Sequence, residues 1–472
     1  MYAKRIDGVF ADLMPGQSVK LSRHNPIFNF EGIIGSLIND YFFPSTSTND
    51  KIFGYFKVAQ MRYPNKKYYC ETIVDGYIQE RTYIELVDCT DDGYVCVENQ
   101  GLSEVFGAYQ NIPLNRLPLG QEVYPSPVKA ANHLTDKYCW PTVGAANFYG
   151  VNVQAGFNGK INDWAGGATL NANSRVPMLY FRWIFEQITL LTGWSFKGEF
   201  FTSEEFKRAV MFNVFSVDDD VNIYFANHLP ELTIPELLMN LRRLYNLGLF
   251  FNVNLKTITA IFGETILNKA TRLDWTAKIE PDSRRRPERA NRIQLDWELD
   301  QGDNLMKDLP LPTGFDKYVT PETQLGTVFE IKTRLSTLAV TGGYAYVQQI
   351  GASPRFNQAG QKFTARIAFW TGVDGSGIPV ISPTYGTTTL AMAGAQNIPT
   401  KFWASYEKFR SKTASKTVFA NLNSADLQRI NWHNNDDADY SVFIKGKEYY
   451  IASVNIPLPL EGLCELELWE KP

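Results

Sequence analysis

The feature that most constrains the fold is a strand–turn–strand pattern that recurs at both ends of the chain. Near the start, Tyr68–Val74 is followed by Asp75-Gly76 and by further strand-forming residues. Asp-Gly is a strong hairpin signal because glycine accepts a positive φ. Near the end, Tyr440–Ile444, a Lys-Gly-Lys turn and Tyr449–Val454 repeat the pattern. The chain is therefore predicted to form antiparallel β meanders at both ends.

Between these regions the sequence predicts two helices, near 177–192 and 234–246. Pro177 suits a first helical turn, and Gly193 suits a C-terminal stop. Thr233 and Glu236 form a capping box at the start of the second helix, which we expect to end at Gly248. Two strands, 249–253 and 257–262, are expected to follow.

The 472 residues are too many for one hydrophobic core, so two to four domains are expected. We divide the chain into an N-terminal β-barrel or meander domain (1–125), a mixed α/β region (126–330) and a C-terminal β domain (331–472). The predicted class is α+β and β-rich. By composition, Pro44–Asp50 is expected to be an exposed loop.

Charge and cysteine content exclude several classes of protein. The net charge of −4 gives no case for nucleic-acid affinity, which needs clustered Lys and Arg. Five cysteines without a CxxC pair favour reduced thiols over a disulfide scaffold. No apolar run reaches the length of a signal peptide or a membrane-spanning helix.

We predict no catalytic residue, cofactor site or metal site. The four histidines lack partners at metal-ligand spacing, except His433, which precedes the oxygen-rich run Asp436–Asp439. That run is an ordinary polar loop or, as the alternative, a cation site. Asp218 and Asp220 could act as paired carboxylates, but a solvated turn is the preferred interpretation.

A basic run is the one candidate contact site. It consists of Arg284, Arg285, Arg286 and Arg289. Such a run can contact phosphate or an acidic partner surface, but an exposed, solvated loop is the preferred interpretation.

Six short segments follow one another along the chain: Asn25–Phe28, Tyr41–Thr46, Asn49–Tyr55, Phe148–Gly150, Phe157–Asn162 and Leu191–Gly198. This succession resembles structural proteins of tailed bacteriophages, of the type found in phages and prophages of Bacteroidetes. The helix over 234–246 with its two following strands resembles a unit of tail baseplate hubs and of the hub part of type VI secretion spikes.

This resemblance implies tail-tube-like β-barrel domains with an inserted, helix-containing α/β region. It implies a ring at the tip of the tail that joins the tube to a spike or fibres and lets the genome pass. Such hubs are commonly trimers with two similar barrels per chain, here near 1–125 and 330–472, and a hexamer is the alternative. The expected location is the virion tail, after synthesis in the bacterial host cytoplasm and without membrane insertion.

Two other functions stay open from the sequence. The aromatics and carboxylates on β-rich loops, such as Gly372–Pro379, would suit a glycan-binding fibre or adhesin. A cell-wall or polysaccharide hydrolase could use Asp218 and Asp220 as its acids.

Overall fold

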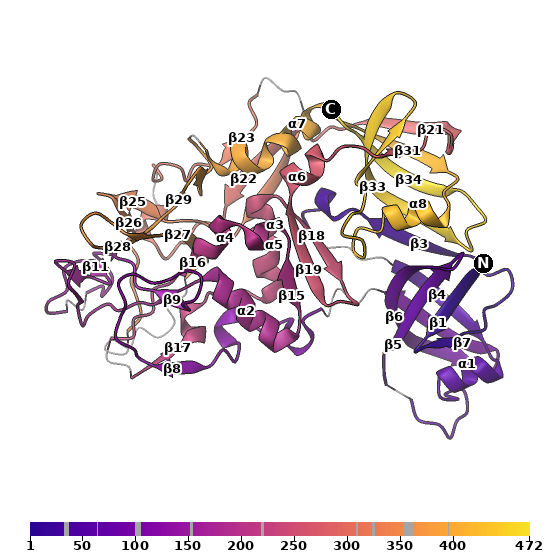
Figure 1. Ribbon diagram of the computed structural model, residues 1–472, viewed down its shortest axis with the longest axis horizontal. Helices are drawn as coiled ribbons and strands as arrows, with labels where there is room; N and C mark the ends of the chain where they lie inside the picture. Colours follow the sequence, from indigo (N-terminus) through magenta and orange to yellow (C-terminus); the bar gives the residue numbers. More distant parts are fainter. Residues whose placement is uncertain are drawn as a thin grey trace.

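The computed structural model describes residues 1–32, 37–63, 65–99, 105–151, 154–218, 221–307, 310–322, 326–353, 363–394 and 396–472. Strands dominate, and most of the helices of the described residues fall between residues 181 and 268 (Figure 1). The predicted α+β, β-rich class is confirmed.

Strands from both ends of the chain, together with two strands from its middle, form one large, curled sheet. The order along its path is β2-β1-β5-β6-β7-β4-β3-β33-β34-β31-β21, while β32 pairs with β33 and β20 off that path. Its strands are β1 (Tyr2–Ile6), β2 (Val9–Phe10), β3 (Val19–His24), β4 (Leu37–Pro44), β5 (Tyr68–Val74), β6 (Tyr77–Thr90), β7 (Gly93–Asn99), β20 (Leu273–Asp274), β21 (Ile279–Pro287), β31 (Ala414–Ala420), β32 (Ser441–Ile444), β33 (Lys447–Leu458) and β34 (Cys464–Glu470).

The pairing of β3 with β33 joins the first and last parts of the chain. It runs antiparallel from Val19 opposite Leu458 to His24 opposite Ser453. The predicted hairpins fall on either side of it: Asp75-Gly76 connects β5 to β6, and Lys445-Gly446 connects β32 to β33. As a result, the two meanders lie side by side on the right of Figure 1.

The central region carries short strands in small sheets. The two-stranded sheets are β8 (Gln121–Val123) with β17 (Asn222–Tyr224), β9 (Tyr138–Cys139) with β14 (Met178–Leu179), β12 (Trp164–Ala165) with β13 (Thr169–Leu170), and β29 (Thr384–Tyr385) with β30 (Thr388–Thr389). The three-stranded sheets have the orders β15 (Ser195–Lys197), β19 (Thr257–Phe262), β18 (Leu247–Asn252); β16 (Ala209–Phe212), β27 (Arg366–Val373), β28 (Pro379–Ser382); and β23 (Tyr318–Val319), β22 (Arg292–Trp297), β24 (Val328–Thr333). The four-stranded sheet has the order β11 (Lys160–Ile161), β10 (Val143–Gly144), β26 (Tyr344–Tyr346), β25 (Ala339–Thr341).

The two predicted helices are present, with shifted ends. The helices of the described residues are α1 (Ser47–Ile52), α2 (Phe181–Thr192), α3 (Glu199–Thr202), α4 (Glu204–Arg208), α5 (Ile234–Tyr245), α6 (Gly263–Asn268), α7 (Ala404–Lys412) and α8 (Ser424–Arg429). The capping box of α5 is confirmed, and Gly193 caps α2 with φ 74°. Within these residues, none of the helices has the length and apolar character needed to cross a bilayer.

Three local predictions were wrong for tertiary reasons. Pro177 does not open α2, because Met178–Leu179 first pairs with β9 as a strand. Asn246, with φ 51°, ends α5 before Gly248, which lies inside β18. The expected loop Pro44–Asp50 contains the start of α1, which the Thr46 side chain caps.

Among the described residues, two large hydrophobic clusters form most of the interior, and a small third one contains Met306, Phe315 and Ala339. One lies in the central region and includes side chains of α2 and α5. The other combines side chains from both ends of the chain, such as Ile6 and Tyr94 with Ile456 and Leu466. The first and last strand groups therefore share a core as well as a sheet. The domain boundaries at 125 and 330 remain predictions.

Candidate functional site

The basic run lies on β21, at one end of the large sheet. Arg284, Arg285 and Arg286 stand opposite Thr417, Lys416 and Ser415 of β31. Every residue from Glu280 to Pro287 is exposed, and Arg289 just beyond is exposed as well. The preferred loop prediction was therefore wrong about secondary structure, because pairing with β31 extends the segment. The predicted exposure is confirmed.

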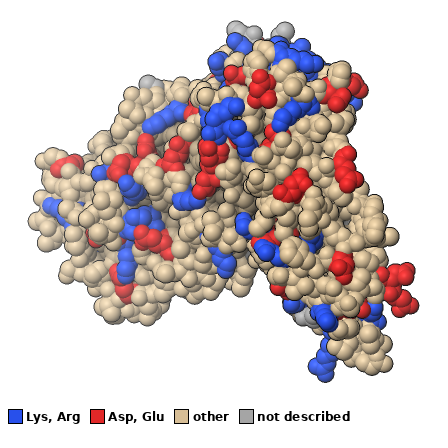
Figure 2. Space-filling view, turned by 45° about the vertical axis from the view of Figure 1, so that its right-hand side comes forward, with Lys and Arg blue, Asp and Glu red and all other residues tan. Residues whose placement is uncertain are grey.

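A basic cluster surrounds Arg285. Burial lowers the pKa of Lys416, and the neighbouring cations Lys445, Arg285 and Lys447 lower it further, while Glu470 opposes them. Arg285 donates a hydrogen bond from Nη2 to Glu470 Oε2 at 2.8 Å, and its Nε lies 2.7 Å from Glu470 Oε1. Figure 2 shows Lys and Arg side chains gathered at the upper end of the molecule, the end at which Figure 1 places β21. The geometry suits contact with an acidic surface.

Asp218 has a structural role. It is buried, and its Oδ2 accepts hydrogen bonds from Tyr149 Oη at 2.8 Å and Ser353 Oγ at 2.5 Å. Its Oδ1 accepts from the backbone N–H of Arg175 at 3.3 Å and from the Ser216 hydroxyl. The carboxylate thus holds neighbouring loops together, and the preferred solvated turn was wrong for this residue. Asp220 lies outside the described residues.

Basic side chains surround the second acidic run. Asp436 pairs with Lys197 at 2.7 Å, and Asp437 pairs with Arg272 at 2.9 Å. Arg272 and Arg429 each lie 2.7 Å from Asp439. The hydrogen bond from Arg272 lowers the pKa of Asp437. Because these carboxylates already have cationic partners, the geometry favours an ion-paired loop over a cation site.

Two of the four histidines make hydrogen bonds to other protein groups. The ring Nδ1 of His228 lies 3.1 Å from Asn213 Oδ1, and burial lowers the pKa of His228 to about 3. His433 Nδ1 accepts from the backbone N–H of Phe251 at 3.1 Å. Among the residues the structure describes, no three His, Cys, Asp or Glu side chains converge as metal ligands do.

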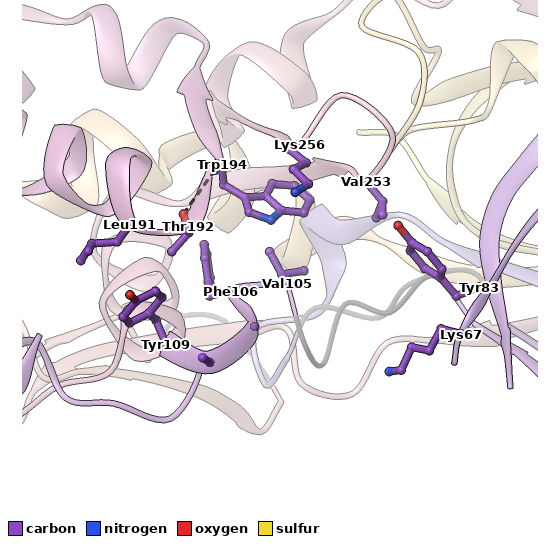
Figure 3. A pocket seen from close by; sticks show the side chains of 12 residues that line it. Lys67, Tyr83, Val105, Phe106, Tyr109, Leu191, Thr192, Trp194, Val253 and Lys256 are labelled. Atoms are coloured by element: carbon purple, nitrogen blue, oxygen red, sulfur yellow. Dashed lines mark hydrogen bonds between the residues drawn. The ribbon is translucent and has the colours of Figure 1, made fainter. Parts of the chain in front are cut away.

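A pocket of about 420 Å³ opens where the N-terminal sheet meets the central region (Figure 3). The indole of Trp194 and the ring of Phe106 line its apolar side, and Lys67 and Lys256 lie toward its rim. Thr192 Oγ1 accepts from the Trp194 backbone N–H at 3.2 Å, fixing the end of α2. Trp194 and Phe106 are both buried, so neither ring offers the exposed platform on which a sugar could stack.

The loop suggested for glycan binding, Gly372–Pro379, is closed by its own hydrogen bonds. Asp374 Oδ1 accepts from the backbone N–H groups of Ser376 at 2.8 Å and Ile378 at 2.9 Å. The Tyr344 hydroxyl donates to Asp374 Oδ2 at 3.4 Å. The one carboxylate of this loop therefore shapes the turn.

Sequence reasoning missed the buried charge networks. Lys4 and Glu98 form an ion pair that is fully buried in the N-terminal strands. In the central region, buried Arg366 contacts Asp303 at 2.6 Å and Asp300 at 3.2 Å. These partners lie far apart in sequence, so no local spacing could have indicated them. Both networks serve folding, since neither reaches solvent.

Comparisons with known proteins find similarity at the level of structure. No family model matches the sequence, and no curated protein matches it. The 43 kDa tail protein of prophage MuSo2 from Shewanella oneidensis aligns over 100% of this chain and 98% of its own, with 10% identity and a TM-score of 0.41.

Two further solved structures are similar. The tail protein from Neisseria meningitidis MC58 covers 99% of this chain and 96% of its own, with 10% identity and a TM-score of 0.38. Prophage tail protein gp18 from Listeria monocytogenes EGD-e aligns over 99% of this chain and 94% of its own, with 8% identity and a TM-score of 0.41. At such values these are distant likenesses, which decide neither the family nor the function of this chain.

Proposed function

We propose that this chain is a structural component of a bacteriophage tail, a baseplate or tail hub. It would form a ring that connects the tail tube to the spike or fibres and lets the genome pass. The observation that supports this best is the pairing of β3 with β33, which sets the first and last strand groups side by side in one curled sheet (Figure 1). In the proposed assembly, each copy would contribute these two neighbouring strand groups as its two β units.

A trimer is the favoured ring, because three copies with two β units each would present six units to a sixfold tube. Its neighbours would be the tube, spike and fibre proteins. DNA would pass through the lumen without sequence-specific contact, and a net charge of −4 suits a conduit that does not hold its cargo. The chain would reside in the virion tail after synthesis in the host cytoplasm.

The first experiment measures the mass of the purified chain by sedimentation and images the particles by electron microscopy. We expect a closed oligomer with a central hole. A chain that stays monomeric at high concentration and leaves no ring in the images would contradict the proposal. The second experiment locates the chain in images of intact particles. A position at the tip of the tail supports the hub, and a position along a fibre supports the adhesin alternative.

A further inference from the structure

Four basic side chains gather in the C-terminal half of the large sheet: Arg285, Lys416, Lys445 and Lys447. Arg285 stands opposite Lys416 across β21 and β31, and the two other lysines flank the glycine turn between β32 and β33. Burial lowers the pKa of Lys416, and the charges of the other three lower it further, against the single carboxylate of Glu470. These four residues are the basic cluster.

The basic cluster has more charge than its neighbours neutralise. Arg285 is paired with Glu470. Within the described part of the chain, Lys416, Lys445 and Lys447 have no ion pair. Four cations less one carboxylate leave three positive charges for a partner.

Negative charge gathers at the end of the hairpin between β6 and β7. Asp88, Asp91 and Asp92 are exposed there, and we call them the acidic tip. Asp88 accepts a hydrogen bond from the backbone N–H of Cys89 at 2.8 Å. Among the residues that the structure describes, the acidic tip has no ion pair, so its three negative charges equal the surplus of the basic cluster.

The two surfaces lie at different ends of the large sheet. In its strand order, β4, β3, β33 and β34 separate β7 from β31. The backbone N–H of Ser45, two residues before α1, donates to the Asp92 carbonyl at 2.7 Å, so the acidic tip lies beside α1. Figure 1 shows α1 at the lower right and β21 with β31 at the upper right. The tip therefore lies far from the basic cluster of its own chain.

We propose that the acidic tip of one copy docks on the basic cluster of the next copy. This inference rests on the proposed ring and names the surfaces that would join its members. The contact is heterologous, because it joins two different surfaces, and repeated head to tail it closes into a ring when the rotation between copies allows. The opposite charges steer the encounter and fix its orientation.

Exposed apolar side chains accompany both surfaces. Val87 directly precedes Asp88 and is 64% exposed, and Phe443 lies two positions before Lys445 and is 36% exposed. A contact that covers both side chains removes apolar surface from water, which favours association without orienting it. Charge thus supplies the specificity of the contact.

Solubility is one competing explanation, since surface charge keeps proteins apart. It explains charge of mixed sign, but not two separated clusters of opposite sign, in which like charges repel one another. DNA phosphate is the other candidate occupant of the basic cluster. It leaves the acidic tip without a role, so a second copy is the occupant that explains both surfaces.

The first variant, the cluster variant, carries Arg285→Glu, Lys445→Asp and Lys447→Glu. The backbone accepts them: Lys445 has φ 46°, and Asp-Gly suits such a turn, while Glu at position 285 stands opposite Lys416. The charge of the cluster changes from three positive to three negative. We expect association at least about tenfold weaker than that of the wild type, because like charges then face each other.

The second variant, the tip variant, carries Asp88→Lys, Asp91→Lys and Asp92→Lys. None of these aspartates has a positive φ, so lysine fits their backbone. Alone it should also associate at least about tenfold more weakly. All six substitutions in one chain exchange the signs of the two surfaces, and association should return to within about threefold of the wild type. Failure of this six-fold variant to recover above either parent overturns the proposal.

A matched control carries Lys307→Glu, Lys317→Glu and Lys332→Glu, three exposed lysines outside the large sheet. It changes the net charge as much as the cluster variant does and should keep wild-type association. Sedimentation measures the mass and affinity of every form, and circular dichroism checks folding. A control that weakens association as much as the cluster variant would show an effect of net charge alone and contradict a specific contact.

A second test detects the contact without altering charge. A zero-length carbodiimide joins carboxylates to lysines that touch them, and a mixture of isotope-labelled and unlabelled copies shows which links join two chains. We expect mixed-isotope peptides that link Asp91 or Asp92 to Lys445 or Lys447, found by mass spectrometry. Their absence from an oligomer of the wild type overturns the proposal.

The outcomes separate this contact from the ring. A closed wild-type oligomer that the cluster and tip variants lose supports both, whereas one that persists in both variants keeps the ring and overturns the contact. Open chains that the variants lose support the contact and contradict the ring, and a monomeric wild type contradicts both. A cluster variant that keeps its association but loses binding to a random-sequence DNA duplex assigns the basic cluster to phosphate and overturns the proposal.

Discussion

Lys4 and Glu98 are the clearest case in which single residues hold this fold together. Burial opposes the charge on Lys4, yet the interaction with Glu98 outweighs it, and the pKa of Lys4 is raised. Thr72 and Thr82 complete the network, donating to Glu98 Oε1 at 3.1 Å and 2.7 Å. Removing one partner leaves the other charge uncompensated in the interior.

We predict that Glu98→Gln lowers the free energy of unfolding by about 3–5 kcal/mol in urea titrations. Lys66→Met, which breaks an exposed ion pair with Asp7, is the control and should lower the free energy of unfolding by less than about 1 kcal/mol. The double variant Lys4→Met, Glu98→Leu should cost less than Glu98→Gln alone, because it leaves no buried charge unpaired. Equal effects of Glu98→Gln and the control would contradict this account.

His228 gives the protein a defined response to acid. Its folded pKa, about 3, lies below the unfolded value of about 6.5, so between these pH values the unfolded chain binds more protons. The contribution of neutral His228 to stability is therefore complete above pH 6.5 and is lost as the pH falls toward 3.

At pH 5 this loss should reach about 2 kcal/mol, since the pH then lies about 1.5 units below the unfolded pKa. The unfolding free energy of the wild type should fall between pH 7 and pH 5, partly because of His228. We predict that His228→Gln makes this fall smaller by the contribution of His228. All other groups titrate in both proteins, so urea titrations of the pair isolate His228. The same difference in wild type and variant would show that this histidine does not titrate on unfolding.

At the scale of elements, helix α5 was predictable because its signals are local. Thr233 Oγ1 accepts from the Glu236 backbone N–H at 3.3 Å, and the Glu236 carboxylate accepts from the Thr233 N–H at 2.7 Å. We predict that Thr233→Ala lowers the unfolding free energy by about 1 kcal/mol, while Thr233→Ser keeps the capping oxygen and nearly all the stability. If Ser were as damaging as Ala in urea titrations, packing of the threonine methyl would be the cause instead.

The strands that were not predicted from the sequence form because they pair with segments far away in the chain. Met178–Leu179 resembles the start of a helix until Tyr138–Cys139 pairs with it. Arg284–Arg286 resembles a polar loop until β31 extends it, because such a charged run has little strand propensity of its own. In both cases the deciding hydrogen bonds come from residues far away in the sequence.

At the scale of the whole molecule, the shared sheet and core make the chain ends interdependent. We predict that residues 1–125 expressed alone lack a cooperative unfolding transition, because β3 loses its partner β33 and the core loses side chains such as Ile456 and Leu466. Co-expression with residues 413–472, which supply β31–β34, should restore a soluble complex. Cooperative unfolding of 1–125 alone, followed by circular dichroism, would instead establish it as an autonomous domain.

Three features were predictable from the sequence: the β-rich class, the hairpin turns at Asp75-Gly76 and Lys445-Gly446, and the cap of α5. These features depend on backbone preferences and hydrogen bonds within a few residues. Three other features depend on tertiary contacts: the pairing of β3 with β33, the burial of Asp218, and the extension of the basic run into an exposed strand. Each of those outcomes rests on contacts between segments remote in sequence, whose free energy no local pattern encodes.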